Sequence, residues 1–188
     1  MTYRRIGKVL AAIAGFAFLV LGSVCVKAQS ADSEKINELF NNIRQHAAHA
    51  EADADLLESY TRSKMSWESH ARRIESMRGH VKDLAADFNE ASRMRAEGSQ
   101  WQQDAINQLQ PVLQGMADHL KATIDHLNDN QSKVHMKPWI DYVHANRDYA
   151  VRAAELIRDY VDYSEAKSAT EKLEQKLQIS PSSTTGEE

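Results

Sequence analysis

Residues 99–130 read SQWQQDAINQLQPVLQGMADHLKATIDHLNDN, and this stretch decides how the rest of the chain is interpreted. Its apolar or small side chains recur at alternating spacings of three and four residues, at Ile106, Leu109, Leu113, Met116, Leu120, Thr123 and Leu127. That spacing is typical of the buried face of a helix packed in a bundle. Ser99 and Gln102 fit a capping box at its start, and residues 128–130 favour a turn at its end. The stretch therefore predicts one long core helix.

Two residues inside this stretch normally weaken helices. Pro111 and Gly115 lie within the pattern, but both fall away from the apolar line. On that side, water can satisfy the carbonyl that Pro111 leaves without a partner. We therefore predict one bent helix and not two.

Three further segments show the same periodicity. A first helix is predicted from residues 32–33 to about Arg62, and a second follows it and ends at Gly98. Glycine is expected there in the left-handed conformation. A fourth helix begins at Pro138, which suits a first helical turn. We predict an all-α protein in which residues 29–178 form an antiparallel up-down-up-down four-helix bundle.

The first 28 residues have the composition of a secretory signal peptide. A basic lead containing Arg4, Arg5 and Lys8 precedes eighteen residues, 9–26, that are apolar or small and carry no charge. Small or β-branched side chains at Val26 and Ala28 predict cleavage after Ala28. The mature protein is then expected in the periplasm or outside the cell.

Two alternatives to a cleaved signal stay open. Residues 6–26 are long enough to remain as a membrane anchor. We expect the chain to contact a membrane only if they do. Cys25 suggests a lipid attachment site, but Val24 stands where that motif has Gly or Ala. Residues 179–188 have the composition of a disordered tail.

Charge and cysteine usage limit the possible functions. Of the 23 basic side chains, four precede residue 29, which leaves 19 against 27 acidic ones and a net charge of −8. Phosphate backbones repel such a chain, so we predict no nucleic-acid partner. No cysteine follows residue 28, so the exported part must be stabilised by its core without disulfides. Nucleophile elbows and phosphate loops are absent as well, and we predict no enzyme activity.

Histidines supply the candidate metal ligands. His46 and His70 fall on the apolar lines, His49 lies beside one, and His126 lies on a flanking column. Facing helices of bundles often hold a metal or haem, and His46 and His49, three residues apart, can share an ion. The alternative is that these histidines are structural, with Asp53 and His70 forming a polar layer that fixes the register of the helices. That pair would raise the pKa of His70 unless the loss of solvation outweighs it.

The central half of the chain resembles a family of exported α-helical bundle proteins of soil bacteria that has no assigned activity. The residues that carry the resemblance are Trp67, His70, His80, Val81, Trp101, Gln102, Gln103, Ala105, Ile106, Pro111, Leu113, His126 and Leu127. The resemblance implies export and a helical bundle, and it transfers no active-site residue. We therefore expect an exported, non-enzymatic binding or structural module of the envelope without a cofactor, whose partner is an unidentified protein or small molecule. The rival hypothesis is a bundle that binds metal or haem through its histidines.

Overall fold

The computed structural model describes residues 31–178, and every long element in that range is a helix. The elements are α1 (Glu34–Arg62), α2 (Trp67–Arg93), the 3₁₀ turn η1 (Arg95–Glu97), α3 (Gln100–Asp129), the 3₁₀ turn η2 (Gln131–Lys133) and α4 (Lys137–Leu177). The prediction of an all-α protein with four helices is confirmed. The predicted signal peptide (1–28), the alternative anchor (6–26) and the predicted tail (179–188) lie outside the described residues.

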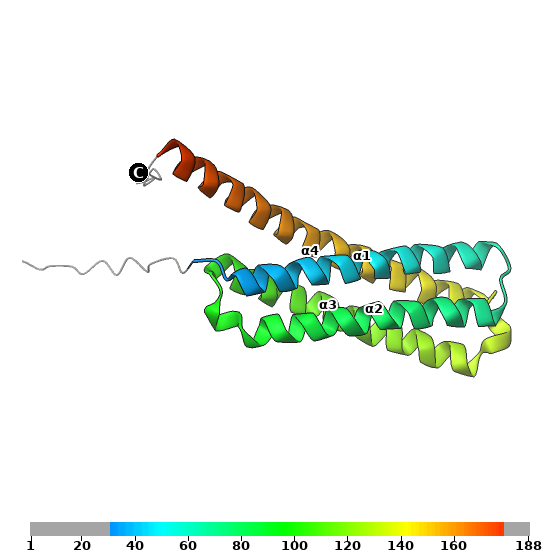
Figure 1. Ribbon diagram of the computed structural model, residues 1–188. Helices are drawn as coiled ribbons and strands as arrows, with labels where there is room; N and C mark the ends of the chain where they lie inside the picture. The colour runs from blue at the N-terminus through cyan, green and yellow to red at the C-terminus, as the bar shows by residue number, and fades with distance from the viewer. Residues whose placement is uncertain (1–30, 179–188) are drawn as a thin grey trace, which may run out of the picture.

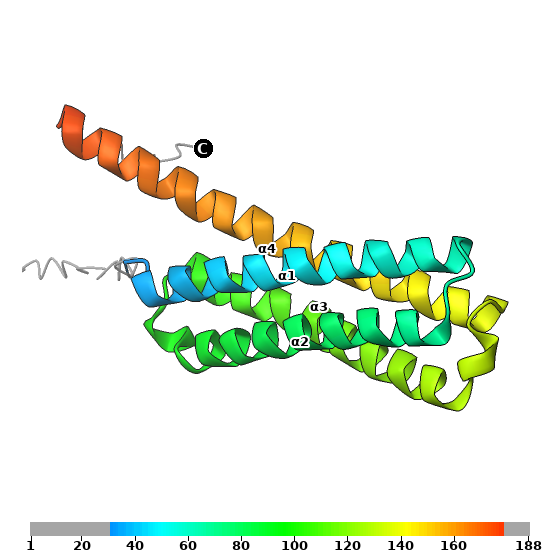
Figure 2. The same ribbon diagram turned by 45° about the vertical axis from the view of Figure 1, so that its right-hand side comes forward.

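Successive helices run in opposite directions, as Figures 1 and 2 show. α1 packs against α2 and α4, and α3 packs against the same two helices. Ion pairs between α1 and α4 follow this arrangement: Arg44 meets Glu165 at 3.3 Å, and Asp55 meets Arg147 at 2.6 Å. Residue numbers thus rise along α1 as they fall along α4.

The core is built from the apolar lines that the sequence predicts. Its largest fully buried side chains are Trp139, Phe40, Ile36, Leu39, Ile43, Leu57, Met77, Leu84, Ile106, Leu109, Met116 and Ile157. Ala47, Ala50 and Ala54 are also fully buried on α1, and such small side chains allow close helix approach. α3 passes through Pro111 without interruption, as predicted.

Gln102 joins the starts of α1 and α3. Its Oε1 atom accepts the Ser99 N–H at 3.0 Å, within the capping box that the sequence predicts, and also the Ser33 N–H at 2.9 Å. Ser33 in turn caps α1, because its hydroxyl accepts from the N–H of Ile36. The two helices therefore begin at the same end of the bundle.

The predicted role of Gly98 is wrong. α2 already ends at Arg93, and Gly98 has a φ of −82°, which is ordinary extended backbone. A Cβ atom added there would lie 2.9 Å from Ile36 Cδ1 and 3.2 Å from Gln102 Cβ. Glycine is thus needed because the chain passes close to α1 and α3, and not because of a left-handed turn.

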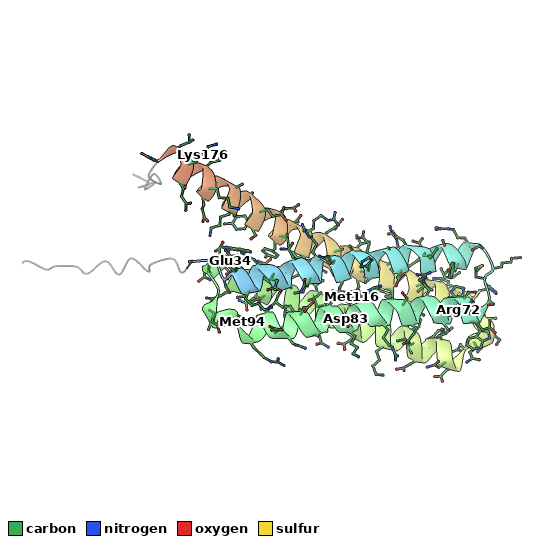
Figure 3. All side chains as sticks on the ribbon, in the orientation of Figure 1. Glu34, Arg72, Asp83, Met94, Met116 and Lys176 are labelled. Atoms are coloured by element: carbon green, nitrogen blue, oxygen red, sulfur yellow. The ribbon has the colours of Figure 1, made fainter. Side chains whose placement is uncertain are left out.

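The C-terminal part of α4 leaves the bundle. Val161 is its last buried residue, although the helix continues to Leu177, and both views show this part diverging from the other helices (Figures 1 and 2). Side chains stand out on all sides of it in Figure 3. Tyr163 is 51% exposed and Leu173 57% exposed. Tyr160 follows the buried Ile157 at the three-residue spacing of the core, but it is only partly buried, and the adjacent Val161 is buried instead.

Candidate functional site

A groove runs between α3 and the middle of α4, with a volume of about 710 Å³; we call it the α3/α4 groove. Five residues of each helix line it: Asn107, Gln108, Pro111, Val112 and Gly115, and Tyr149, Arg152, Glu155, Leu156 and Asp159. α3 presents compact side chains here, at Pro111, Val112 and Gly115, and these leave space below the diverging α4.

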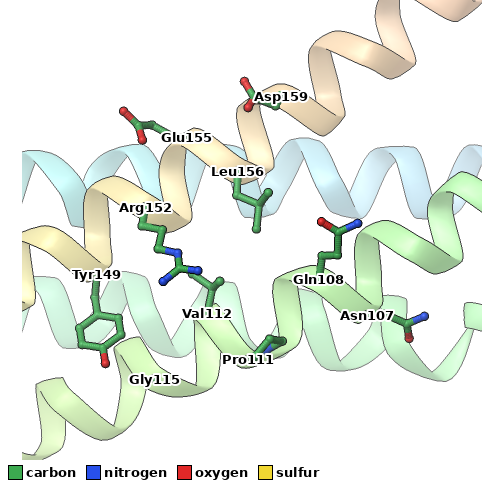
Figure 4. A pocket seen from close by; sticks show the side chains of 10 residues that line it. All are labelled: Asn107, Gln108, Pro111, Val112, Gly115, Tyr149, Arg152, Glu155, Leu156 and Asp159. Carbon is green, nitrogen blue, oxygen red and sulfur yellow. The ribbon is translucent and has the colours of Figure 1, made fainter.

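The interior of the α3/α4 groove is mixed in character (Figure 4). Val112, Leu156 and Arg152 point between the helices, and Gln108 points from α3 toward α4, whereas Asp159 stands at the outer edge. Arg152 is exposed and is the one basic residue of the lining, which also contains the acidic residues Glu155 and Asp159. The groove thus combines apolar side chains with charges of both signs.

A tyrosine closes one end of the groove. The ring of Tyr149 lies directly over Gly115, where an added Cβ would stand 2.9 Å from its Cε1 atom. Beyond it, rings alternate between α3 and α4, with centroids 5.5 Å apart for His119 and Tyr149, 5.6 Å for His119 and Tyr142, and 4.6 Å for Tyr142 and His126. Tyr142 and Tyr149 of α4 therefore pack against histidines of α3.

A second hollow of about 380 Å³, which we call the aromatic–acidic pocket, lies next to the other end of the groove. It is lined by Trp101, Asp104, Gln108, Leu156, Asp159, Tyr160 and Tyr163. The rings of Trp101 and Tyr163 pack edge to face, with centroids 5.2 Å apart and planes at 69°. Gln108, Leu156 and Asp159 line both hollows, so the two spaces adjoin.

Trp101 is fixed by contacts behind the pocket. Its indole Nε1–H donates to Asp32 Oδ1 at 2.7 Å, and its ring lies 6.1 Å from that of Phe40. Asp32 also accepts from Lys167 Nζ at 2.7 Å. Burial raises the pKa of Asp32, but hydrogen bonds from Lys167, Ser99 and Trp101 outweigh burial and hold that pKa below its usual value.

The pocket carries uncompensated negative charge. Neither Asp104 nor Asp159 forms an ion pair within the described part of the chain; Asp104 Oδ1 accepts a hydrogen bond from Gln100 Nε2 at 3.0 Å. Burial, with a further contribution from the charge of Asp104, raises the pKa of Tyr160. The carboxylate of Asp104 therefore acts directly on the aromatic wall.

Two of the candidate metal ligands, His46 and His49, lie between α1 and α2. His49 stacks on His80 with ring centroids 5.0 Å apart, and the His46 ring lies 6.3 Å from that of His80. His46 Nε2 is 3.8 Å from Asp87 Oδ2. The neighbours of His46 are thus a histidine ring and a carboxylate.

The predicted pair of Asp53 and His70 is wrong. Asp53 instead accepts a hydrogen bond from Arg73 at 2.5 Å, and its other oxygen is 3.8 Å from His80 Nε2. α2 is therefore offset along α1 relative to the predicted register, so that Arg73 reaches the buried carboxylate from the helix edge.

His70 is fully buried at the opposite end of the bundle from Trp101. Trp139 Nε1–H donates to its Nδ1 at 3.3 Å, and the Tyr60 ring packs edge-on at 5.6 Å. Burial, helped by the charge of His135, lowers the pKa of His70 to about 4. The sequence predicts the opposite direction, but no carboxylate offsets the loss of solvation.

The four candidate ligands fall in two separate places. His46 and His49 lie at the α1/α2 contact, whereas His70 and His126 flank Trp139, with ring centroids 5.4 Å and 6.2 Å from its own. Among residues 31–178, no three histidine, cysteine or acidic side chains are grouped so that they can hold a metal ion.

Sequence reasoning missed the residues that line the two hollows. The sequence did carry two signals: the tyrosines of α4 recur at heptad spacing, and the apolar pattern shifts after Ser164. An aromatic line that continues past the apolar core indicates a ring that the core does not cover, and Tyr163, 51% exposed, is that ring. Tyr160 lies off this line and carried no such signal.

Comparisons with known proteins add no assignment. No protein-family model, curated protein or solved structure matches this chain. Within the described residues, none of the helices is both long and apolar enough to cross a membrane.

Proposed function

We propose that this chain is an exported, non-enzymatic helical-bundle protein of the envelope, located in the periplasm or secreted, that binds a ligand in the α3/α4 groove. The observation that carries the proposal is the groove itself, with its volume of about 710 Å³. Ligand pockets typically measure roughly 300–1,000 Å³ and combine apolar walls with a few polar groups. The resemblance of about residues 60–163 to exported bundle proteins is part of the same proposal.

The lining of the groove supplies groups suited to binding. Arg152 and Gln108 can orient a polar group, while Val112 and Leu156 supply apolar contact.

The proposal is tested by mapping bound molecules with ¹H–¹⁵N NMR spectra. A library of small amphiphilic molecules is added to the exported protein, to Gln108→Trp, which fills the groove, and to Asn128→Trp, which changes an exposed residue of α3 outside the hollows. We expect shifts at residues 108–112 and 152–156 in the wild type and in Asn128→Trp, and a loss of these shifts in Gln108→Trp.

Other outcomes would contradict the proposal. Binding that persists in Gln108→Trp places the ligand elsewhere. A complete lack of bound molecules at the groove removes the support for a binding module and favours a purely structural role.

A further inference from the structure

The walls of the aromatic–acidic pocket favour a positive charge. Trp101, Tyr160 and Tyr163 line it from two helices, and Tyr163 is 51% exposed, so part of its ring is open to a ligand. The faces of aromatic rings carry partial negative charge and attract cations, most strongly for tryptophan.

Two carboxylates add full negative charge to the same pocket. Asp104 and Asp159 line it, and within residues 31–178 neither is in an ion pair. No lysine, arginine or histidine is among the lining residues. The nearby Lys167 is held by Asp32 at 2.7 Å and Glu171 at 3.4 Å, so it does not compensate these acids. Unpaired acids at a partly apolar hollow raise the local concentration of cations.

We infer that the aromatic–acidic pocket binds the head group of a small organic cation, a quaternary or substituted ammonium ion. This inference rests on the proposed ligand-binding function and names the class of the ligand. A weakly hydrated ammonium ion suits a wall of rings, whereas a divalent metal ion needs a set of oxygen or nitrogen ligands that the described residues do not group there.

The adjoining α3/α4 groove has room for the rest of the ligand. Leu156 and Gln108 line both hollows, so an apolar chain attached to the ammonium group extends over Leu156 toward Val112. The cation then occupies the end near Trp101, and the rest of the ligand lies toward Val112 and Arg152.

The test uses two probes of the same shape. Choline carries a quaternary nitrogen, and 3,3-dimethylbutan-1-ol has a neutral carbon in its place. Each is titrated at low ionic strength into the ¹⁵N-labelled exported protein, and the indole N–H signal of Trp101 is followed after its assignment with Trp101→Phe. We expect saturable shifts of Trp101 and of the amides of Tyr160 and Tyr163 with choline. The neutral analogue should bind at least about fivefold more weakly.

Three variants locate the cation. Asp104→Asn and Tyr163→Leu should each weaken choline binding about two- to fivefold, since each removes one exposed electrostatic contact. Asp148→Asn removes the same charge from an exposed site of α4 outside the pocket, and its affinity should match that of the wild type. Circular dichroism melts confirm that each variant is folded.

Each contrary outcome has a distinct meaning. Equal binding of the neutral analogue, or equal weakening by Asp148→Asn and Asp104→Asn, overturns the cation inference. The cation inference is also overturned if choline does not bind while other library molecules map to the α3/α4 groove. In that case the proposed function stands. If neither choline nor any library molecule binds there, both proposals fail.

Discussion

The buried imidazole of His70 makes stability depend on pH. Its folded pKa of about 4 lies below the ordinary value of 6.5, because burial disfavours the charged form. The unfolded chain therefore binds more protons between these values, so stability is complete above pH 6.5 and falls by up to about 3 kcal/mol toward pH 4. Replacement with leucine should flatten this decline, although the Trp139 N–H then loses its acceptor.

An NMR titration of the ring protons measures this directly. We expect the His70 ring to titrate near pH 4, and its signal should be missing from His70→Leu. The exposed His144, which both proteins contain, is the control ring. A His70 midpoint at or above 6.5 would show that a carboxylate, and not burial, governs the site.

Replacement by alanine should change the free energy of unfolding in opposite directions at two glycines. In Gly98→Ala the new methyl group meets Ile36 and Gln102 at 2.9–3.2 Å in a buried site, so we expect a loss of about 1–3 kcal/mol through overpacking. In Gly79→Ala nothing lies within 4 Å, and the helix should gain up to about 1 kcal/mol. Urea unfolding of both variants checks the pair; stabilisation by Gly98→Ala would refute the close approach.

At the scale of the helix, α3 should be least protected where the groove meets it. Pro111 cannot donate a hydrogen bond to the carbonyl of Asn107, and Gly115 costs about 1 kcal/mol relative to alanine. We expect amide hydrogens of residues 107–115 to exchange faster than those of residues 120–127. Hydrogen-exchange mass spectrometry measures both segments in one experiment, and the reverse order would rule out a soft groove wall.

The helices could be predicted from the sequence, but their relative positions could not. Spacings of three and four residues identify the face that a helix buries, and they correctly placed Ile106 and Leu109 in the core. The same spacing carries no information on how far one helix slides along another. Asp53 therefore contacts Arg73 where the sequence predicted His70.

The groove escaped prediction for a related reason. It lies where α3 carries compact side chains at Pro111, Val112 and Gly115, opposite residues 149–159 of α4, which all precede Val161. Local periodicity identifies the buried face of each helix, but it does not give the distance between two helices. The sequence shows that residues 160 and 163 are aromatic, but it does not predict that Tyr160 and Tyr163 line a hollow.

For the whole molecule, the prediction of export can be tested independently of the fold. We expect the secreted or periplasmic protein to begin at Gln29, because the uncharged run ends just before Ala28. Mass spectrometry of the intact protein, recovered separately from soluble and membrane fractions, gives the first residue. Recovery of Met1 in the membrane fraction would show that residues 6–26 remain as an anchor.

The contacts of Asp32 set a limit on where the chain can be processed. Its carboxylate holds both the Trp101 indole and the Lys167 ammonium, yet it precedes α1. The expected cut leaves three residues before it, so a cut only four residues later would release the side chain that secures one wall of the aromatic–acidic pocket. Accurate proteolysis during export would then be a condition for ligand affinity, and a mis-trimmed product would be a folded bundle with a loosened binding site.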